Sequence, residues 1–239
     1  MPRTVRKKAR ARKTSSLTSV QSLVGKCEAK AHEGLTELVR EHVFVGCASD
    51  MLVLVQHGTK LYMLDLPPLT REAAYQSCLR RFGDLDRIVL QPAAPVRSLV
   101  RATLDCPEAG WSEEDGDKED IAEYVTNLLV HEKGEMLSIY FALTFDPATE
   151  TLTTLPELLD NLLPPLPLLG MFLLRLAIQV DWTSEEGCFA TVAKELAELY
   201  MVRPSFTKEI LPDDLRGHIS GHISRKEASS QREGAGGGA

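Results

Sequence analysis

The sequence predicts an α/β domain, because short apolar runs typical of strands alternate with longer segments that have helical spacing. The clearest strands fall at residues 43–45, 51–55 and 61–64, which are rich in β-branched and aliphatic residues. Gly58 supplies a turn between the second and third runs. Runs this apolar are typical of strands covered on both faces, so we expect a buried sheet here.

Three segments with apolar residues at helical spacing are expected to pack around these strands. The first helix runs to residue 39 from Ser22, whose hydroxyl can accept the early backbone N–H groups as an N-cap. The second follows Pro67 and Pro68, which prevent the preceding strand from continuing, and is capped by Thr70. The third, over residues 185–200, has the strongest amphipathic pattern.

The region between the second and third helices contains shorter elements. Strands are expected at 88–90 and 152–155 and a helix at 96–104. The acid-rich stretch 112–123 is interpreted as the start of a further helix, because the helix macrodipole favours acidic residues near an N-terminus. A calcium loop is the alternative, but the glycine and the final glutamate are not in EF-hand register.

The most apolar stretch, residues 162–180, contains three prolines and Arg175. A membrane span needs about 20 apolar residues in an unbroken helix, so a proline-rich turn followed by a buried element at 168–178 is expected instead. The N-terminus also lacks the charged-then-apolar pattern of a secretory signal. No membrane association is therefore expected.

Charge is distributed unevenly along the 239 residues. Residues 1–13 contain seven of the 27 Lys and Arg residues and no acid, which leaves 20 basic residues against 34 acidic ones in the rest. An acidic body does not favour DNA binding, which needs a positive surface. The predicted basic arm, residues 1–15, is suited to nuclear import or to weak DNA contact, and a passive linker is the alternative.

Cysteine and histidine spacing predicts no metal site. The five cysteines form no CxxC pair, which fits reduced thiols inside a cell, and Cys47 and Cys78 are expected in the core as small hydrophobes. His218 and His222 are four residues apart, but without neighbouring thiols or carboxylates they are assigned to a flexible tail, residues 204–239. No cofactor is expected.

Several short motifs occur in one order along the chain: FVGC at 44–47, QHGTKLYML at 56–64, DCPEAGWSEEDG at 105–116, GEML at 134–137 and LLDN at 158–161. Together they resemble the C-terminal domain of the eukaryotic MutL mismatch-repair family, and within it the Mlh subunit, which lacks the nuclease site. The resemblance covers residues 17 to about 203. No single motif is catalytic; their order and spacing make the resemblance specific.

The resemblance implies an α/β fold in which a dimerisation subdomain is interrupted by an inserted, mainly helical external subdomain. Here the domain would cover residues 16–203 and the insertion about 113–185. Family members continue with a return segment that has no match after about Arg203, so this chain is expected to be truncated or divergent there.

The resemblance also implies that no residue of this chain is catalytic and that the fragment is not an enzyme. Nucleolytic relatives carry a DQHAxxExxxE-type metal motif, whose first position corresponds to Asp65. Pro67 stands where the histidine would be and Arg71 where a glutamate would be. Proline cannot bind a metal, and arginine repels one. Gln56-His57 has the same two residue types as the motif, but it lies one strand before the motif position. His57 is therefore interpreted as a turn residue.

The function implied is a scaffold in the nucleus that pairs with a Pms-type MutL homologue and docks other repair proteins. Its partner surface is expected in residues 17–110, with Phe44, Gln56, Leu61 and Leu64 as the partner-binding side chains. Two alternatives remain open. One is a metal-dependent nuclease that uses Asp65, His57 and acidic residues elsewhere; the other is a structural α/β module with a nonspecific basic arm.

Overall fold

The computed structural model describes residues 15–160 and 162–204. Most of the predicted basic arm, nearly all of the predicted tail, and both His218 and His222 lie outside the described residues.

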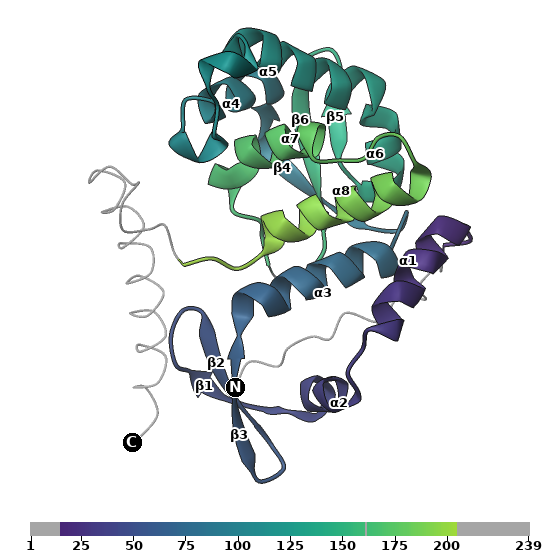
Figure 1. The fold of residues 1–239 in the computed structure, drawn as a ribbon, viewed down its shortest axis with the longest axis vertical. Coiled ribbons are helices and arrows are strands. Elements are labelled where there is room, and N and C mark those ends of the chain that lie inside the picture. Colours follow the sequence, from purple (N-terminus) through teal and green to yellow (C-terminus); the bar gives the residue numbers. More distant parts are fainter. Residues whose placement is uncertain (1–14, 161, 205–239) are drawn as a thin grey trace, which may run out of the picture. The chain divides into compact units, whose positions relative to one another are not determined.

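The described part of the chain opens with two helices and a three-stranded antiparallel sheet in the order β1-β2-β3 (Figure 1). The strands predicted at 43–45, 51–55 and 61–64 are confirmed, each with slightly different bounds. The register shifts between Phe44 and Gly46, which leaves Val45 as a bulge in β1. These elements are α1 (Thr18–Ala29), α2 (Glu33–Glu41), β1 (Val43–Cys47), β2 (Leu52–His57) and β3 (Lys60–Asp65).

A second antiparallel sheet, in the order β4-β6-β5, lies farther along the chain with helices packed around it. The predicted strands at 88–90 and 152–155 and the helices at 96–104 and 185–200 are confirmed. The acidic stretch precedes a helix, as expected, and Asp117 caps it. The elements are α3 (Leu66–Arg80), β4 (Asp86–Pro95), α4 (Val96–Thr103), α5 (Lys118–Thr126), a π-helical segment (Asn127–Glu132), α6 (Gly134–Phe141), β5 (Thr144–Asp146), β6 (Thr151–Glu157), α7 (Leu169–Ile178) and α8 (Glu185–Tyr200).

Two predicted helix starts are wrong. The single helix expected from Ser22 is two helices, and Ser22 lies inside α1, where its hydroxyl donates to Glu186. The break falls at His32, whose extended backbone and ring Nδ1 cap the start of α2. Thr70 also lies inside its helix, because α3 begins four residues earlier and includes both prolines in its first turn. Proline is tolerated there, since the first N–H groups of a helix have no partner within it.

Helices α3, α7 and α8 form the main core with the second sheet. An aromatic cluster of Phe82, Tyr140, Phe141 and Phe189 lies between α3, α6 and α8, with ring centroids 4.6–6.1 Å apart. The predicted buried element at 168–178 is α7. None of the helices within the described ranges is long and apolar enough to cross a membrane.

Close packing and capping hold α7 and α8 in place. A Cβ added at Gly170 would lie 2.1 Å from Thr103 Oγ1, so only glycine lets α7 approach α4 this closely. On α8, the buried Glu195 carboxylate accepts from Arg175 Nε at 2.7 Å. Before α8, the Asp181 carboxylate accepts hydrogen bonds from the chain that leads into the helix.

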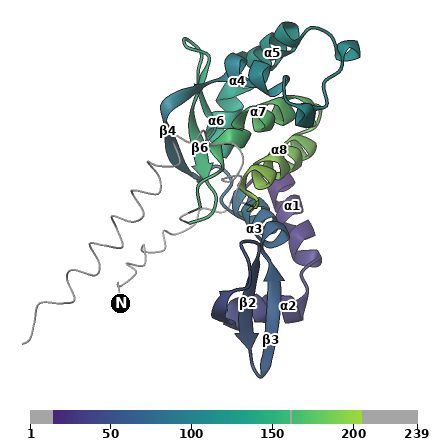
Figure 2. The ribbon, with the colours of Figure 1, turned by 90° about the vertical axis from the view of Figure 1, so that its left-hand side faces the viewer.

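The first sheet lies apart from this core. Figure 2 shows β2 and β3 extending beyond α3, with α2 beside them. Val55 and Leu38 are buried, yet neither belongs to the main core cluster. The expectation of a buried sheet is therefore wrong for this chain: β1 is largely exposed, because α2 is a single short helix and cannot cover three strands on both faces.

The bounds of the external subdomain stay a prediction. Strand β4 lies before residue 113 and pairs with β6, which lies after it. Helix α4 likewise packs against α5 and α7 across the same position. The expected insertion thus shares its sheet and its core with residues that precede it.

Candidate functional site

The two faces of the β1-β2-β3 sheet differ in exposure. Along β3, Leu61 and Met63 are each 61% exposed, whereas Tyr62 and Leu64 are half-buried. Successive side chains of a strand point to opposite faces, so Leu61 and Met63 lie on one face and Tyr62 and Leu64 on the other. The half-buried face also carries Val55, the partner of Tyr62 in the register.

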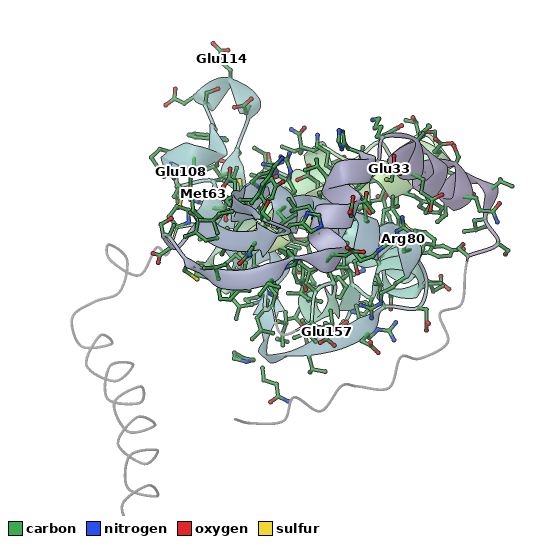
Figure 3. The ribbon with its side chains drawn as sticks, turned by 90° about the horizontal axis from the view of Figure 1, so that it is seen from below. Glu33, Met63, Arg80, Glu108, Glu114 and Glu157 are labelled. Carbon is green, nitrogen blue, oxygen red and sulfur yellow. The ribbon has the colours of Figure 1, made fainter. Side chains whose placement is uncertain are left out.

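The exposed face, here called the open face, is defined by five side chains from three strands; Leu52 and Asp65 continue the same face toward α3. Leu61 pairs with Gln56, which pairs with Val43 on β1, and Leu54 pairs with Met63. Val43 is 64% exposed, and Gln56 is exposed as well. In Figure 3, Met63 lies on one side of the view, and Glu33 of α2 and Arg80 at the end of α3 lie on the other. Four of the five side chains are apolar.

Both outer strands of this sheet are edges. Within the described residues, β1 and β3 each pair only with β2. An edge strand presents unpaired backbone N–H and C=O groups, and proteins normally blunt such edges with charge or cover them. Here apolar side chains lie on both edge strands, including Phe44 and Val45 on β1, which are more than half exposed.

The structure brings together two of the four predicted partner-binding residues. Gln56 and Leu61 are cross-strand neighbours on the open face. Leu64 lies on the opposite, half-buried face, and Phe44 is exposed on β1 opposite Val55. Sequence reasoning missed Val43 and Met63. Period-two alternation along β3 was the signal available for Met63, since it shares a face with Leu61.

A groove of about 890 Å³ lies between α1, α2 and α3. Its apolar lining includes Leu23, Leu35, Val39 and Tyr75, and four cationic side chains surround it: Lys26, Lys30, Arg40 and Arg80. Burial raises the pKa of the Tyr75 hydroxyl to about 12.

Asp65 and His57, the two named residues of the alternative nuclease site, do not converge. Asp65 pairs with Leu52 at one end of the hairpin, and His57 pairs with Lys60 at the other. Arg71 faces Glu198 at 3.7 Å. His57 was predicted as a turn residue, but it is the last residue of β2, where it pairs with Lys60, and its Nε2 faces two glutamates of α2.

The two cysteines expected in the core differ. Cys78 is fully buried, and burial raises the pKa of its thiol to about 12. Cys47, at the end of β1, is exposed, so its predicted core position is wrong. The reason is the same as for the rest of β1: no element of the described chain covers that strand.

This geometry defines the class of protein: a domain of mixed helices and sheets, with one apolar sheet face left uncovered. The family model described as "DNA mismatch repair protein Mlh1 C-terminus" matches residues 16–235. The chain belongs to that family, within the MutL proteins, and the resemblance found in its motifs is confirmed. The match continues beyond Arg203, so the expectation that the family pattern has no match after that residue is wrong.

Two relatives show the extent of the similarity. The chain is 40% identical over 202 residues to the DNA mismatch repair protein Mlh1 of Dictyostelium discoideum, covering 84% of this chain and 23% of that protein. It is 28% identical over 195 residues to MLH1 of Saccharomyces cerevisiae, covering 78% of this chain and 25% of that protein. The chain thus spans about a quarter of the length of these relatives.

Proposed function

We propose that this chain is the heterodimerisation domain of a mismatch-repair scaffold, and that it pairs with a Pms-type MutL homologue through the open face. The observation that carries the proposal is the exposure of Val43, Leu61 and Met63 together on one face of a sheet. Membership of the Mlh1 C-terminal family and the mismatch-repair names of the relatives support it.

The physical argument is that this face is costly to leave in water. Contiguous exposed apolar surface in a folded protein marks an interaction site or an aggregation liability. The open face continues onto edge strands that can add backbone hydrogen bonds to a partner. An obligate interface is large and apolar, and it would cover the residues that α2 leaves exposed.

We infer also that the domain contributes no nuclease chemistry. A two-metal site needs several oxygen or imidazole ligands that converge around ions about 4 Å apart. Asp65 is followed by two prolines in the first turn of α3, and the nearest candidate histidine in sequence lies at the far end of the hairpin. The proposed partner would cleave the DNA.

The seven cations of residues 1–13 are proposed to direct the chain to the nucleus or to hold DNA weakly. The acidic rest of the chain favours neither nuclear import nor DNA binding. Deleting residues 1–13 from a fluorescent fusion should reduce its nuclear accumulation. Unchanged distribution and unchanged DNA retention at low salt would indicate a passive linker.

Size-exclusion chromatography with light scattering tests the pairing. The chain alone is expected to be poorly soluble, and mixing it with a Pms-type C-terminal domain should give a soluble one-to-one complex. A clean, stable monomer that ignores that domain would contradict the proposal.

The nuclease inference has its own assay. The purified chain should not nick supercoiled DNA in the presence of manganese. Nicking that is lost in Asp65→Ala would establish a catalytic role for this chain and overturn the inference.

A further inference from the structure

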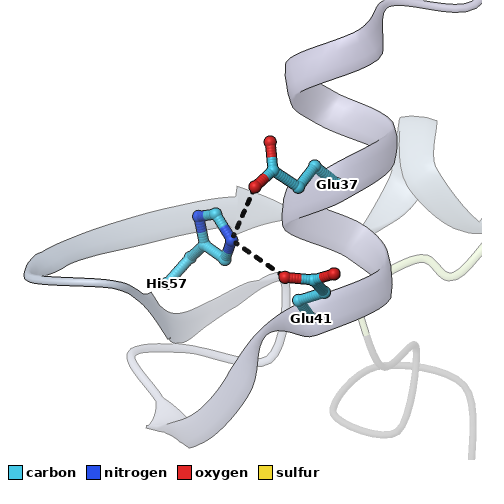
Figure 4. A group of neighbouring side chains, drawn as sticks. All are labelled: Glu37, Glu41 and His57. Atoms are coloured by element: carbon cyan, nitrogen blue, oxygen red, sulfur yellow. Dashed lines mark ion pairs between the residues drawn. The ribbon is translucent and has the colours of Figure 1, made fainter.

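Three potential metal ligands meet on the half-buried side of the first sheet. Glu37 and Glu41 lie one turn apart on α2, and His57 approaches them from the end of β2 (Figure 4). His57 Nε2 is 3.8 Å from a carboxylate oxygen of Glu37 and 4.0 Å from one of Glu41. All three ligand atoms lie within 4.8 Å of one another.

The two carboxylates favour a positive charge between them. Two glutamates at positions i and i+4 of a helix repel each other. The His57 side chain is only 24% exposed, so β2 holds the imidazole at a defined place beside the helix. A shared cation would convert the repulsion of the two carboxylates into attraction.

We propose that Glu37, Glu41 and His57 form a binding site for a divalent transition metal ion of the zinc class. One imidazole nitrogen and two carboxylate oxygens are a ligand set that Zn²⁺ accepts, whereas Ca²⁺ and Mg²⁺ prefer oxygen ligands alone. Three protein ligands leave a further coordination position for water.

The distances require only a small closure. Zinc bonds of about 2.1 Å at a tetrahedral angle place neighbouring ligand atoms about 3.4 Å apart. The observed separations from His57 Nε2 are 3.8 and 4.0 Å, and both glutamate side chains are about 60% exposed. Exposed glutamates can change rotamer without disturbing packed neighbours, so α2 and β2 need not move.

The metal would have a structural consequence. It would cross-link α2 to β2 outside the main core, where few buried side chains join these elements. His57 shares its face of β2 with Val55, so the site lies on the side of the sheet opposite the open face. The inference therefore does not depend on the proposed partner.

Zinc titration against a chromophoric chelator tests the site on the full chain after metal removal. Wild type should hold one Zn²⁺ more tightly than His57→Gln and more tightly than Glu37→Gln/Glu41→Gln. The expected loss is at least the roughly 10- to 100-fold caused by removing an outer-shell partner of a metal site. Zinc should also raise the thermal midpoint of wild type more than that of either variant.

The matched control is His131→Gln, which removes another surface histidine, one that faces a single glutamate at 3.7 Å. It should keep the wild-type affinity. The double glutamate variant keeps the test valid if His57→Gln does not fold, since both carboxylates are exposed. Equal zinc affinity in wild type and the glutamate variant, or an equal loss in His131→Gln, would overturn the proposal.

Discussion

Replacing Leu61 with alanine should weaken binding of the Pms-type partner while leaving the isolated domain stable. Leu61 lies on edge strand β3 and is 61% exposed, so its side chain contributes little to folding in this chain alone. Surface substitutions of this kind usually change the free energy of unfolding by less than about 0.5 kcal/mol.

The effect on binding can be estimated from that exposure. Full burial of a leucine side chain contributes about 1.5–3 kcal/mol. If a partner covers the 61% that remains exposed, the gain is about 0.9–1.8 kcal/mol. This range corresponds to about a 5- to 20-fold increase in Kd when most of the side chain is removed.

Isothermal titration calorimetry with the Pms-type domain would measure this change, and thermal unfolding of the isolated chain would check the fold. Ile178→Ala is the matched control, because Ile178 is 57% exposed on α7, outside the open face. An unchanged Kd for Leu61→Ala, or an equal loss for the control, would refute the argument that the open face is the binding surface.

Three further outcomes test the account of the fold. Gly170→Ala should destabilise the chain by about 1–3 kcal/mol, because the added methyl group overpacks the contact between α7 and α4. Gly25→Ala in α1 should stabilise the chain by about 0.5–1 kcal/mol, because its added methyl group meets no atom within 4 Å. Urea unfolding measures the free energy of unfolding of both variants. Arg175→Ala leaves the buried Glu195 without its partner and should cost about 3 kcal/mol or more in the same assay. Hydrogen bonds from Thr183 and Ser184 lower the pKa of the Asp181 carboxyl below its ordinary 3.8. The ionised carboxylate therefore stabilises the fold above that pH, and this stabilisation is lost as the pH falls. The thermal midpoint of wild type should exceed that of Asp181→Asn by less at about pH 3 than at about pH 5.

Local patterns were sufficient to predict most elements. The amphipathic spacing of residues 185–200 gave the bounds of α8, and the apolar runs around Gly58 gave the β2–β3 hairpin. These predictions depend on side chains close together in sequence, where helical and strand periodicities are distinct. The first helix start failed because the cap is His32, a less common cap than Ser or Thr. The second failed because Pro67 and Pro68 were assigned to the end of a strand, although proline is also favoured in the first turn of a helix.

Exposure and long-range contacts could not be read from the same patterns. An apolar strand at an interface with another protein can have the same amino-acid composition as a strand in a core. The composition of the first sheet therefore led to the expectation that it is buried. His57 meets Glu37 and Glu41 only because α2 folds back beside β2. Sequence separations of 20 and 16 residues from His57 are not a metal-ligand spacing. Cys47 was misplaced for the same reason as its strand.

Amide hydrogen exchange with and without the Pms-type domain tests the central claim most directly. The account predicts that amides of β1 and β3 become protected when the partner binds, because within the described chain each of these strands has no pairing strand on its outer side. Helix α7, which is buried in the main core, should exchange equally in both states. Protection confined to other elements, with residues 43–65 unchanged, would contradict the claim that this sheet receives the partner.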